Sequence, residues 1–190
     1  MSLADRISPE ASLAVIIPAW NEGACLEVLI PALHAVLVKL QAPYEITVVD
    51  NCSHDGTVEV CRLHGARVVQ QQERGYGGAL LAGFHSTDAS HIVTMDADLS
   101  HPPAFIESFW AQREAAPVII ASRYVAGGKA DMELGRYLLS RCLNFAFRAA
   151  LLLPMKDVSS GFRMYRRSAV ATLRFERRDF DVLEEIICLQ

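Results

Sequence analysis

The sequence lacks several features that mark special classes of protein. Its 190 residues include only 11 glycines and 8 prolines, and 52% are apolar, so a disordered or low-complexity chain is excluded. No uninterrupted apolar run approaches the length of a membrane span, and the N-terminus lacks the basic and then apolar pattern of a signal peptide. We therefore expect a soluble or peripheral protein built around one large domain.

Cysteine is present without any recognisable arrangement. The five residues are Cys25, Cys52, Cys61, Cys142 and Cys188. Their number is odd and no two of them are separated by the short spacing of a zinc knuckle or a redox pair, so neither site nor a disulfide framework is expected. This usage is typical of a reducing compartment, and we expect the protein in the cytoplasm.

Basic charge is scarce in the first part of the chain. Lysine and arginine number 18 against 22 acidic residues, which argues against nucleic-acid binding because phosphate neutralisation needs surplus positive charge. Residues 1–112 hold 5 basic and 13 acidic side chains, whereas residues 113–190 hold 13 and 9. The basic second part predicts an anionic partner there, although a solvated charged surface would have the same composition.

Short apolar runs alternate with longer helical patterns between residues 13 and 123. We expect strands at Leu13–Pro18, Tyr44–Asp50, Ala66–Gln70, His91–Asp96 and Val118–Arg123. We expect helices at Glu22–Leu40, Gly56–Leu63, Gly77–Ser86 and Pro103–Glu114. This alternation predicts an α/β domain, doubly wound, with a mostly parallel sheet and helices on both faces. Ligands of such domains bind outside the carboxyl ends of the strands.

The pattern changes after Arg123. A helix is expected over Gly135–Leu153, with its arginines gathered on one face, and Pro154 ends it. Such a helix is a core-facing surface helix or a membrane-interface helix. We divide the chain into a tail at residues 1–12 and a single domain at residues 13–190, whose apolar periodicity is still running at the last residue, as in a truncated domain.

Two carboxylates follow the fourth expected strand. Asp96 and Asp98 are two residues apart, so in an extended chain both side chains point to the same face. Paired carboxylates repel unless a cation lies between them, and Mg²⁺ or Mn²⁺ prefers such oxygen ligands. Asp179 and Asp181 match the same pattern but begin a helical one, where capping is the better interpretation.

Other polar residues follow the neighbouring strands. Asp50, which ends the second expected strand, is interpreted as a ligand contact or a helix cap, and Asp55 as a structural turn residue. The glycine-rich Arg74–Gly78 loop lacks the third glycine of a dinucleotide fingerprint, where Leu80 stands, and the Gly-Lys-Ser/Thr of a P-loop. We interpret its glycines as close backbone packing near a ligand.

Six motifs in order resemble a known family. They are P-A-W-N-E, V-V-D-N-x-S-x-D-G-T, G-Y-G-G-A-L, M-D-A-D-L-S-H-P-P, A-S-R-Y and D-V-S-S-G-F-R-M-Y-R-R. Together, over residues 13–188, they resemble the inverting family 2 glycosyltransferases, and within these the dolichol-phosphate mannosyltransferase-like, or polyprenyl-phosphate glycosyltransferase, branch. The resemblance implies the nucleotide-diphospho-sugar transferase fold called GT-A.

The resemblance also implies roles for single residues on the donor side. The positions that hold the nucleotide match Pro18, Trp20, Glu22, Asp50 and Asp96, and Trp20 stands where the family more often has Tyr. The metal-binding D-x-D matches Asp96 and Asp98, which would hold Mg²⁺ or Mn²⁺ on the donor diphosphate. In some relatives a Gln two positions later also binds the metal; here Ser100 offers only a shorter, weaker ligand.

On the acceptor side the resemblance implies a phosphate-binding set. Arg123 matches an arginine beside the donor phosphates, and Arg136 and Ser140, one helical turn apart, match residues that grip an acceptor phosphate. Arg163 is a further phosphate-facing candidate, although a structural ion pair with Asp157 explains it nearly as well. Residues 13–123 would thus form the donor and metal part, and residues 124–190 the acceptor part.

The implied reaction moves a hexose, mannose or glucose, from a nucleoside-diphosphate sugar such as GDP-mannose or UDP-glucose to a polyprenyl or dolichyl phosphate. Such an enzyme would work at the cytoplasmic face of the membrane with peripheral contact. Two alternatives remain: transfer to a hydroxyl acceptor, which would require a general base, and a nucleotide-sugar-binding module without turnover. A haloacid dehalogenase-like phosphatase also has an Asp-x-Asp pair, but after its first strand.

Overall fold

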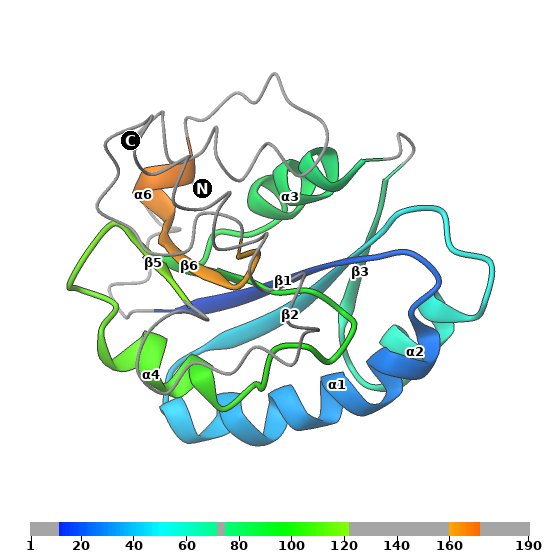
Figure 1. Cartoon of the computed structure of the whole chain (residues 1–190), viewed down its shortest axis with the longest axis horizontal. Coiled ribbons are helices and arrows are strands. Elements are labelled where there is room, and N and C mark those ends of the chain that lie inside the picture. Colours follow the sequence, from blue (N-terminus) through cyan, green and yellow to red (C-terminus); the bar gives the residue numbers. More distant parts are fainter. Residues whose placement is uncertain (1–11, 72–74, 122–159, 172–190) are drawn as a thin grey trace, which may run out of the picture.

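A six-stranded sheet forms the centre of the domain (Figure 1). The computed structural model of the chain describes residues 12–71, 75–121 and 160–171. The strands are β1 (Leu13–Ala19), β2 (Tyr44–Asp50), β3 (Arg67–Gln70), β4 (His91–Thr94), β5 (Val118–Ile120) and β6 (Arg163–Arg166). They lie in the order β3-β2-β1-β4-β6-β5, and all are parallel except β6, which runs antiparallel to β4 and β5. The expected mostly parallel α/β sheet is confirmed.

Helices cover both faces of this sheet, also as expected. One face carries α1 (Gly23–Leu37), its 3₁₀ extension η2 (Val38–Leu40), α2 (Thr57–Leu63) and α4 (Phe105–Ala111). The other carries α3 (Tyr76–His85) and the short α6 (Arg167–Val170). Alternate side chains of β1 enter the two cores, with Val15 on the α1 side and Ile16 on the α3 side. Burial on both faces explains the continuous apolar run of this strand.

The strand β6 was not predicted. Its residues, Arg-Met-Tyr-Arg, carry a charge at each end, and four residues of this kind resemble a solvated loop. Yet Arg163 and Tyr165 are fully buried, and Met164 is nearly so. Tertiary packing therefore overrides the local pattern, because β6 fills the space between β4 and β5.

The boundaries of several elements differ from those predicted. The fourth strand ends at Thr94, before Asp96, and the fifth ends at Ile120 within the described residues. The long first helix is confirmed, but its last turn is 3₁₀ and is followed by Gln41 in the left-handed conformation. The helix expected over Gly135–Leu153 lies outside the described residues.

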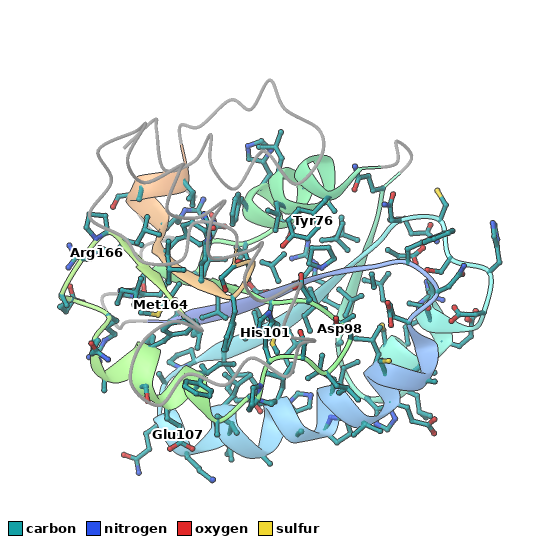
Figure 2. All side chains as sticks on the ribbon, in the orientation of Figure 1. Tyr76, Asp98, His101, Glu107, Met164 and Arg166 are labelled. Carbon is teal, nitrogen blue, oxygen red and sulfur yellow. The ribbon has the colours of Figure 1, made fainter. Side chains whose placement is uncertain are left out.

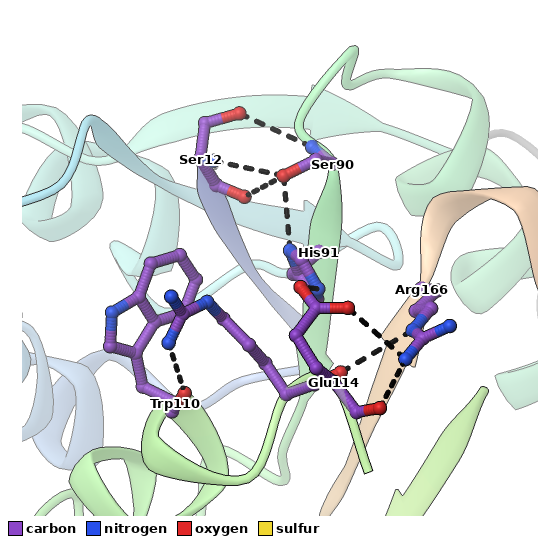
Figure 3. Close-up of polar contacts among 7 residues, drawn as sticks. Ser12, Ser90, His91, Trp110, Glu114 and Arg166 are labelled. Atoms are coloured by element: carbon purple, nitrogen blue, oxygen red, sulfur yellow. Dashed lines mark hydrogen bonds and ion pairs between the residues drawn. The ribbon is translucent and has the colours of Figure 1, made fainter. Parts of the chain in front are cut away.

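A polar cluster lies where β1 and β4 begin (Figure 3). Ser12 and Ser90 exchange hydrogen bonds, and the Ser90 hydroxyl contacts Nδ1 of His91 at 3.0 Å. The Glu114 carboxylate lies 3.7 Å from Nε2 of His91 and 3.1 Å from the Arg166 guanidinium. The cluster ties the starts of β1 and β4 to the end of β6.

The segment Gly23–Leu40 is the one helix among the described residues that is long and apolar enough to cross a membrane by length and composition. In the fold, five of its large apolar side chains are completely buried, while Val28 and Val38 are exposed. The buried ones are Leu26, Leu29, Ile30, Leu33 and Leu37. The buried side chains pack against the sheet within one hydrophobic core.

Candidate active site

The turns that follow β1, β2 and β4 meet at one edge of the sheet. Ala19 at the end of β1 is in register with Asp50 at the end of β2. On the other side of β1, the Met95 amide donates to the Ile16 carbonyl at 3.2 Å, which carries the chain into the Asp96 turn. The expected meeting of the three polar turns is therefore confirmed.

The first two turns are joined by hydrogen bonds. Asn21, in the left-handed conformation at φ 56°, donates its amide to the Ser53 hydroxyl at 2.9 Å. Its side-chain oxygen accepts a hydrogen bond from the His54 amide, also at 2.9 Å. Beside this pair, Pro18 is partly buried in β1, whereas the Trp20 side chain is 53% exposed. An exposed indole next to a polar turn is suited to stacking on a planar ligand.

The position of Glu22 is fixed by the start of α2. Its amide donates to the Thr57 hydroxyl at 3.0 Å, and that hydroxyl in turn donates to the Asp55 carboxylate. Asp55 also accepts from the amides of Gly23 and Thr57, both at 3.1 Å. The Thr57 hydrogen bonds, with that from Gly23, lower the pKa of Asp55. The structural role expected of Asp55 is confirmed.

Asp50 is buried at the end of β2, with only 2% of its surface exposed. Its carboxylate accepts two long hydrogen bonds from the Ser53 amide, at 3.3 and 3.4 Å. These contacts form a turn and not a helix cap, because α2 begins only at Thr57. They leave most of the hydrogen-bonding capacity of the carboxylate to other donors. A ligand role for Asp50 stays a prediction.

The Asp96 carboxylate is one-third exposed and lies among three contacts. The Tyr76 hydroxyl donates to its Oδ1 at 3.4 Å, and Nε2 of His101 lies 3.4 Å from its Oδ2. Gly161 lies beside this carboxylate, since a Cβ on it would be 3.2 and 3.4 Å from the two oxygens. Figure 2 labels Tyr76 at the start of α3 and His101 on the loop after β4.

Asp98 differs from Asp96 in its surroundings. It is exposed, and its Oδ1 accepts a hydrogen bond from the Ser100 amide at 3.0 Å. Leu99, between Asp98 and Ser100, is in the left-handed conformation at φ 63°. Because the strand ends at Thr94, the two carboxylates are not held by an extended chain, as the spacing rule assumed. The turn orients Asp98 instead.

Cys25, in the first turn of α1, connects Asp98 to Glu22. A hydrogen bond to Glu22 raises the pKa of the Cys25 thiol, and burial and the negative charges of Glu22 and Asp98 raise it further. Both carboxylates therefore lie within electrostatic range of one sulfur atom. This agrees with the pairing of β1 and β4, which brings the P-A-W-N-E and D-x-D turns to the same edge of the sheet.

The expected metal site can be tested by asking whether the side chains around Asp96 and Asp98 suit Mg²⁺ or Mn²⁺. Within the described ranges, no group of three or more His, Cys, Asp or Glu side chains is placed to hold a metal ion. Mg²⁺, however, is usually bound by one or two carboxylates together with substrate phosphates, not by a complete protein cage. Asp96 and Asp98, both accessible and both oxygen donors, fit that arrangement.

Of the remaining expected site residues, the structure describes only Arg163. Arg163 is completely buried in β6, and its Nε donates to the Ser160 carbonyl at 2.7 Å. Arg123, Arg136 and Ser140 lie outside the described residues, as does Asp157, the alternative partner of Arg163. The acceptor side therefore stays a prediction.

Two residues at the site were not singled out from the sequence, Tyr76 and His101. Both belong to motifs that were recognised, G-Y-G-G-A-L and M-D-A-D-L-S-H-P-P, but no spacing rule relates them to Asp96. The glycine motif does pack closely: a Cβ on Gly78 would lie 2.2 Å from the Gln71 side-chain nitrogen. Through Tyr76 it also borders the Asp96 carboxylate.

Comparison with known proteins identifies the family of the chain. The model of the family "Glycosyl transferase family 2" matches residues 14–174. The chain belongs to glycosyltransferase family 2. This family 2 chain is 34% identical over 184 residues to a dolichol-phosphate mannosyltransferase of Pyrococcus furiosus, covering 92% of this chain and 52% of the relative. It is 30% identical over 173 residues to an undecaprenyl-phosphate 4-deoxy-4-formamido-L-arabinose transferase of Pseudomonas fluorescens, covering 87% and 50%.

Solved structures support the fold of the family 2 domain. Glucosyl-3-phosphoglycerate synthase from Mycobacterium tuberculosis, crystallised with Mn²⁺ and UDP-glucose, superposes with a TM-score of 0.73 at 24% identity. The match covers 94% of this chain and 64% of that one. The chain spans about half the length of the curated relatives that it matches.

Proposed function

We propose that this family 2 domain transfers a hexose, mannose or glucose, from a nucleoside-diphosphate sugar to a polyprenyl phosphate, with inversion at the anomeric carbon. The observation that carries the proposal is the convergence of the turns after β1, β2 and β4 at one edge of the sheet. It joins the turn expected to hold a cation to the turn expected to hold a nucleotide. The relatives named for transfer to dolichol phosphate and undecaprenyl phosphate support the acceptor class.

In the proposed donor site, the exposed Trp20 indole stacks on the base, and Asp50 accepts hydrogen bonds from donors of the nucleoside. Asp96 and Asp98 would hold Mg²⁺ or Mn²⁺ on the diphosphate. When bound, such an ion supplies charge stabilisation for the departing nucleoside diphosphate. Arg123 would face the same phosphates and act in the same direction.

The proposed step is a single displacement. A new bond forms between the anomeric carbon and an oxygen of the acceptor phosphate, while the bond from that carbon to the β-phosphate oxygen breaks and its electron pair leaves with the nucleoside diphosphate. The acceptor is already an anion near neutral pH, so no strong general base is required. Arg136 and Ser140 are the proposed acceptor contacts, whereas Arg163, which is completely buried in β6, would act on the phosphate only through its charge. Peripheral contact with the cytoplasmic face of the membrane would bring the lipid to this side of the site.

A thermal-shift panel tests the donor half of the proposal. GDP and UDP are added to the purified chain with and without Mn²⁺, and one of them should raise the melting temperature more when Mn²⁺ is present. The response would identify the base as well. A chain stabilised by neither nucleotide would contradict the proposed donor class.

A transfer assay tests the acceptor half. Polyprenyl phosphate should accept the sugar, and Arg136→Ala should weaken acceptor use while nucleotide binding is unchanged. Arg62→Ala, which removes an exposed arginine of α2, is the matched control. Transfer to a hydroxylated lipid in place of the phosphate would favour the hydroxyl-acceptor alternative. Donor binding without hydrolysis or transfer would indicate the binding-module alternative.

A further inference from the structure

Three segments far apart in the sequence converge on the Asp96 carboxylate. They are the start of α3 at Tyr76, the loop after β4 at His101 and the segment before β6 at Gly161. We propose that Tyr76 and His101 are positioning residues, which hold Asp96 in the orientation that it needs to bind the cation and the donor, and that Gly161 must be glycine for this arrangement to form. The inference rests on the donor role that the proposed function gives to Asp96.

The two side chains contact different oxygens of the carboxylate. The Tyr76 hydroxyl donates to Oδ1, and Nε2 of His101 faces Oδ2, both at 3.4 Å. Oδ1 thereby accepts a hydrogen bond and Oδ2 faces the imidazole at ion-pair distance, so rotation of the carboxylate would break both contacts at once. The remaining lone pairs stay available on the exposed side of Asp96. Partners of this kind orient metal ligands in many proteins.

The Tyr76 hydroxyl always carries the proton that it donates to Asp96. Burial raises the pKa of its hydroxyl, and the negative charge of Asp96 acts in the same direction, against the effect of the Arg163 guanidinium. The hydroxyl therefore keeps its proton throughout the physiological range. The backbone that presents it begins at Gly75, whose φ of 141° favours glycine.

His101 is held by ring packing. Its imidazole stacks on the Phe162 ring, with centroids 5.0 Å apart and planes inclined by 24°. Phe162 is buried and meets Phe109 of α4 edge to face at 4.9 Å. The imidazole therefore rests on a fixed aromatic surface, next to the glycine that borders Asp96.

Gly161 closes the arrangement. A Cβ at this position would lie 2.7 Å from the Tyr76 hydroxyl oxygen and 3.2 Å from Oδ1 of Asp96. The glycine cannot move away easily, because its carbonyl accepts a hydrogen bond from the buried Thr94 hydroxyl at 2.7 Å. Any side chain here would push the Tyr76 hydroxyl off the carboxylate.

The first test removes the Tyr76 hydroxyl alone. In Tyr76→Phe we expect the affinity for Mn²⁺, measured by electron paramagnetic resonance in the presence of the stabilising nucleoside diphosphate, to fall by about 10- to 100-fold. The melting temperature should stay within a few degrees of the wild-type value. The matched control is Tyr44→Phe, which removes a hydroxyl that contacts His34 between α1 and β2. Equal Mn²⁺ affinity in Tyr76→Phe and wild type would overturn the proposal.

The second test examines His101 by a conservative exchange. His101→Gln keeps an N–H donor, and His101→Leu removes it while keeping apolar contact with Phe162. We expect the glutamine variant to retain more Mn²⁺ affinity than the leucine variant. The same loss in both variants would contradict a positioning role for the imidazole N–H.

The third test is a double-mutant cycle between Gly161 and Tyr76. Gly161→Ala alone should weaken Mn²⁺ binding about as much as Tyr76→Phe does, because its methyl group displaces the hydroxyl. Added to Tyr76→Phe, the alanine should cost little more, since the hydroxyl is already absent. Additive losses would show that the two residues act separately and would overturn the mechanism proposed for Gly161.

These outcomes are distinct from those that test the function. Reduced Mn²⁺ affinity in the variants, with no transfer to polyprenyl phosphate by the wild type, would support the positioning role and contradict the proposed acceptor. Active transfer by the wild type, with unchanged Mn²⁺ affinity in Tyr76→Phe and both His101 variants, would contradict the positioning role alone.

Discussion

The Asp55 carboxylate accepts hydrogen bonds from the Gly23 amide, in the first turn of α1, and from the Thr57 amide, in the first turn of α2. One side chain therefore satisfies unpaired donors at the starts of two helices. The hydroxyl of the same Thr57 accepts a hydrogen bond from the Glu22 amide. The link between α1 and α2 thus also sets the backbone position of a proposed donor-binding residue.

We expect Asp55→Ala to lower the free energy of unfolding by about 1 kcal/mol, a usual cost for a lost helix cap. Nucleotide binding should weaken as well, because the Thr57 hydroxyl, which accepts the hydrogen bond from the Glu22 amide, would lose its own acceptor on Asp55. Urea unfolding measures the first effect and thermal shift the second. The control is Asp88→Ala, which removes an exposed ion pair with Arg167 and should cost about 0.5 kcal/mol or less. Equal stability of Asp55→Ala and wild type would contradict this role.

Asp98→Asn should remove a charged oxygen ligand with little effect on folding, because the side chain is exposed. We expect Mn²⁺ affinity in the presence of nucleoside diphosphate to fall by more than about 100-fold, the upper end of the effect of residues one step removed from a metal. Electron paramagnetic resonance of free Mn²⁺ measures this loss. Glu59→Gln, at an exposed carboxylate of α2, is the control, and a similar affinity in both variants would exclude Asp98 as a ligand.

Alkylation of Cys25 reports the approach of the two turns. Since Glu22 and Asp98 both raise the pKa of this thiol, Asp98→Asn should lower it and speed the reaction with iodoacetamide near pH 8. Site-resolved mass spectrometry separates Cys25 from Cys61, whose pKa is raised to about 11 by burial and which should react slowly in both proteins. An unchanged Cys25 rate would place Asp98 too far away to act on the thiol.

Stability should depend on pH through His91, which is buried at the far edge of the sheet. Burial lowers its pKa, and Arg113 and Arg166 lower it further, against the opposite effect of Glu114. The unfolded chain, with an imidazole pKa of about 6.5, therefore binds a proton that the folded chain resists. The stability that neutral His91 contributes is fully present above about pH 6.5, and it is lost as the pH falls through the lowered pKa of His91 in the folded chain.

The decline in melting temperature between pH 7 and pH 5 should thus be smaller in His91→Gln than in wild type. Scanning calorimetry over this interval measures it. His85→Gln, at an exposed position at the end of α3, should keep the wild-type slope. The same slope in His91→Gln and wild type would show that His91 does not govern this dependence.

Two glycines of α3 should differ in how much stability they lose on replacement by alanine. A Cβ on Gly83 would lie 2.3 Å from a methyl group of Ile16, which is fully buried and cannot yield, so Gly83→Ala should destabilise by about 1–3 kcal/mol. A Cβ on Gly78 would meet only the end of the Gln71 side chain, so the better helix propensity of alanine should offset the contact to within about 0.5 kcal/mol. Urea unfolding of the two variants measures both effects, and equal losses would contradict the packing described.

The sequence predicted the elements whose local pattern agrees with their environment. The strand Tyr44–Asp50 was placed to the residue, because its Val-Val pair is buried and Asp50 marks its end. The meeting of the Glu22, Asp50 and Asp98 turns followed from the parallel order of the strands. These predictions need only periodicity and one general property of α/β sheets.

The parts of the fold and of the site that were not predicted depend on contacts between residues far apart in the sequence, which no local pattern indicates. Arg163 lies at the start of a buried strand although its charge favours solvent, and only the complete sheet shows the space that it fills. Tyr76 and Gly161 are separated from Asp96 by 20 and 65 residues of sequence, so their contact is visible only in three dimensions. Local spacing could identify Asp96 but not what holds it.

The place of β6 between β4 and β5 also governs how the protein is made. A nascent chain emerging from the ribosome can pair β1 to β4 early, but β5 has no neighbour until residues 163–166 have been synthesised. Until then the exposed edges of β4 and β5 are open to pairing with other chains. Completion of the sheet and assembly of the last contact on Asp96 therefore both require residues 161–166 to have been synthesised.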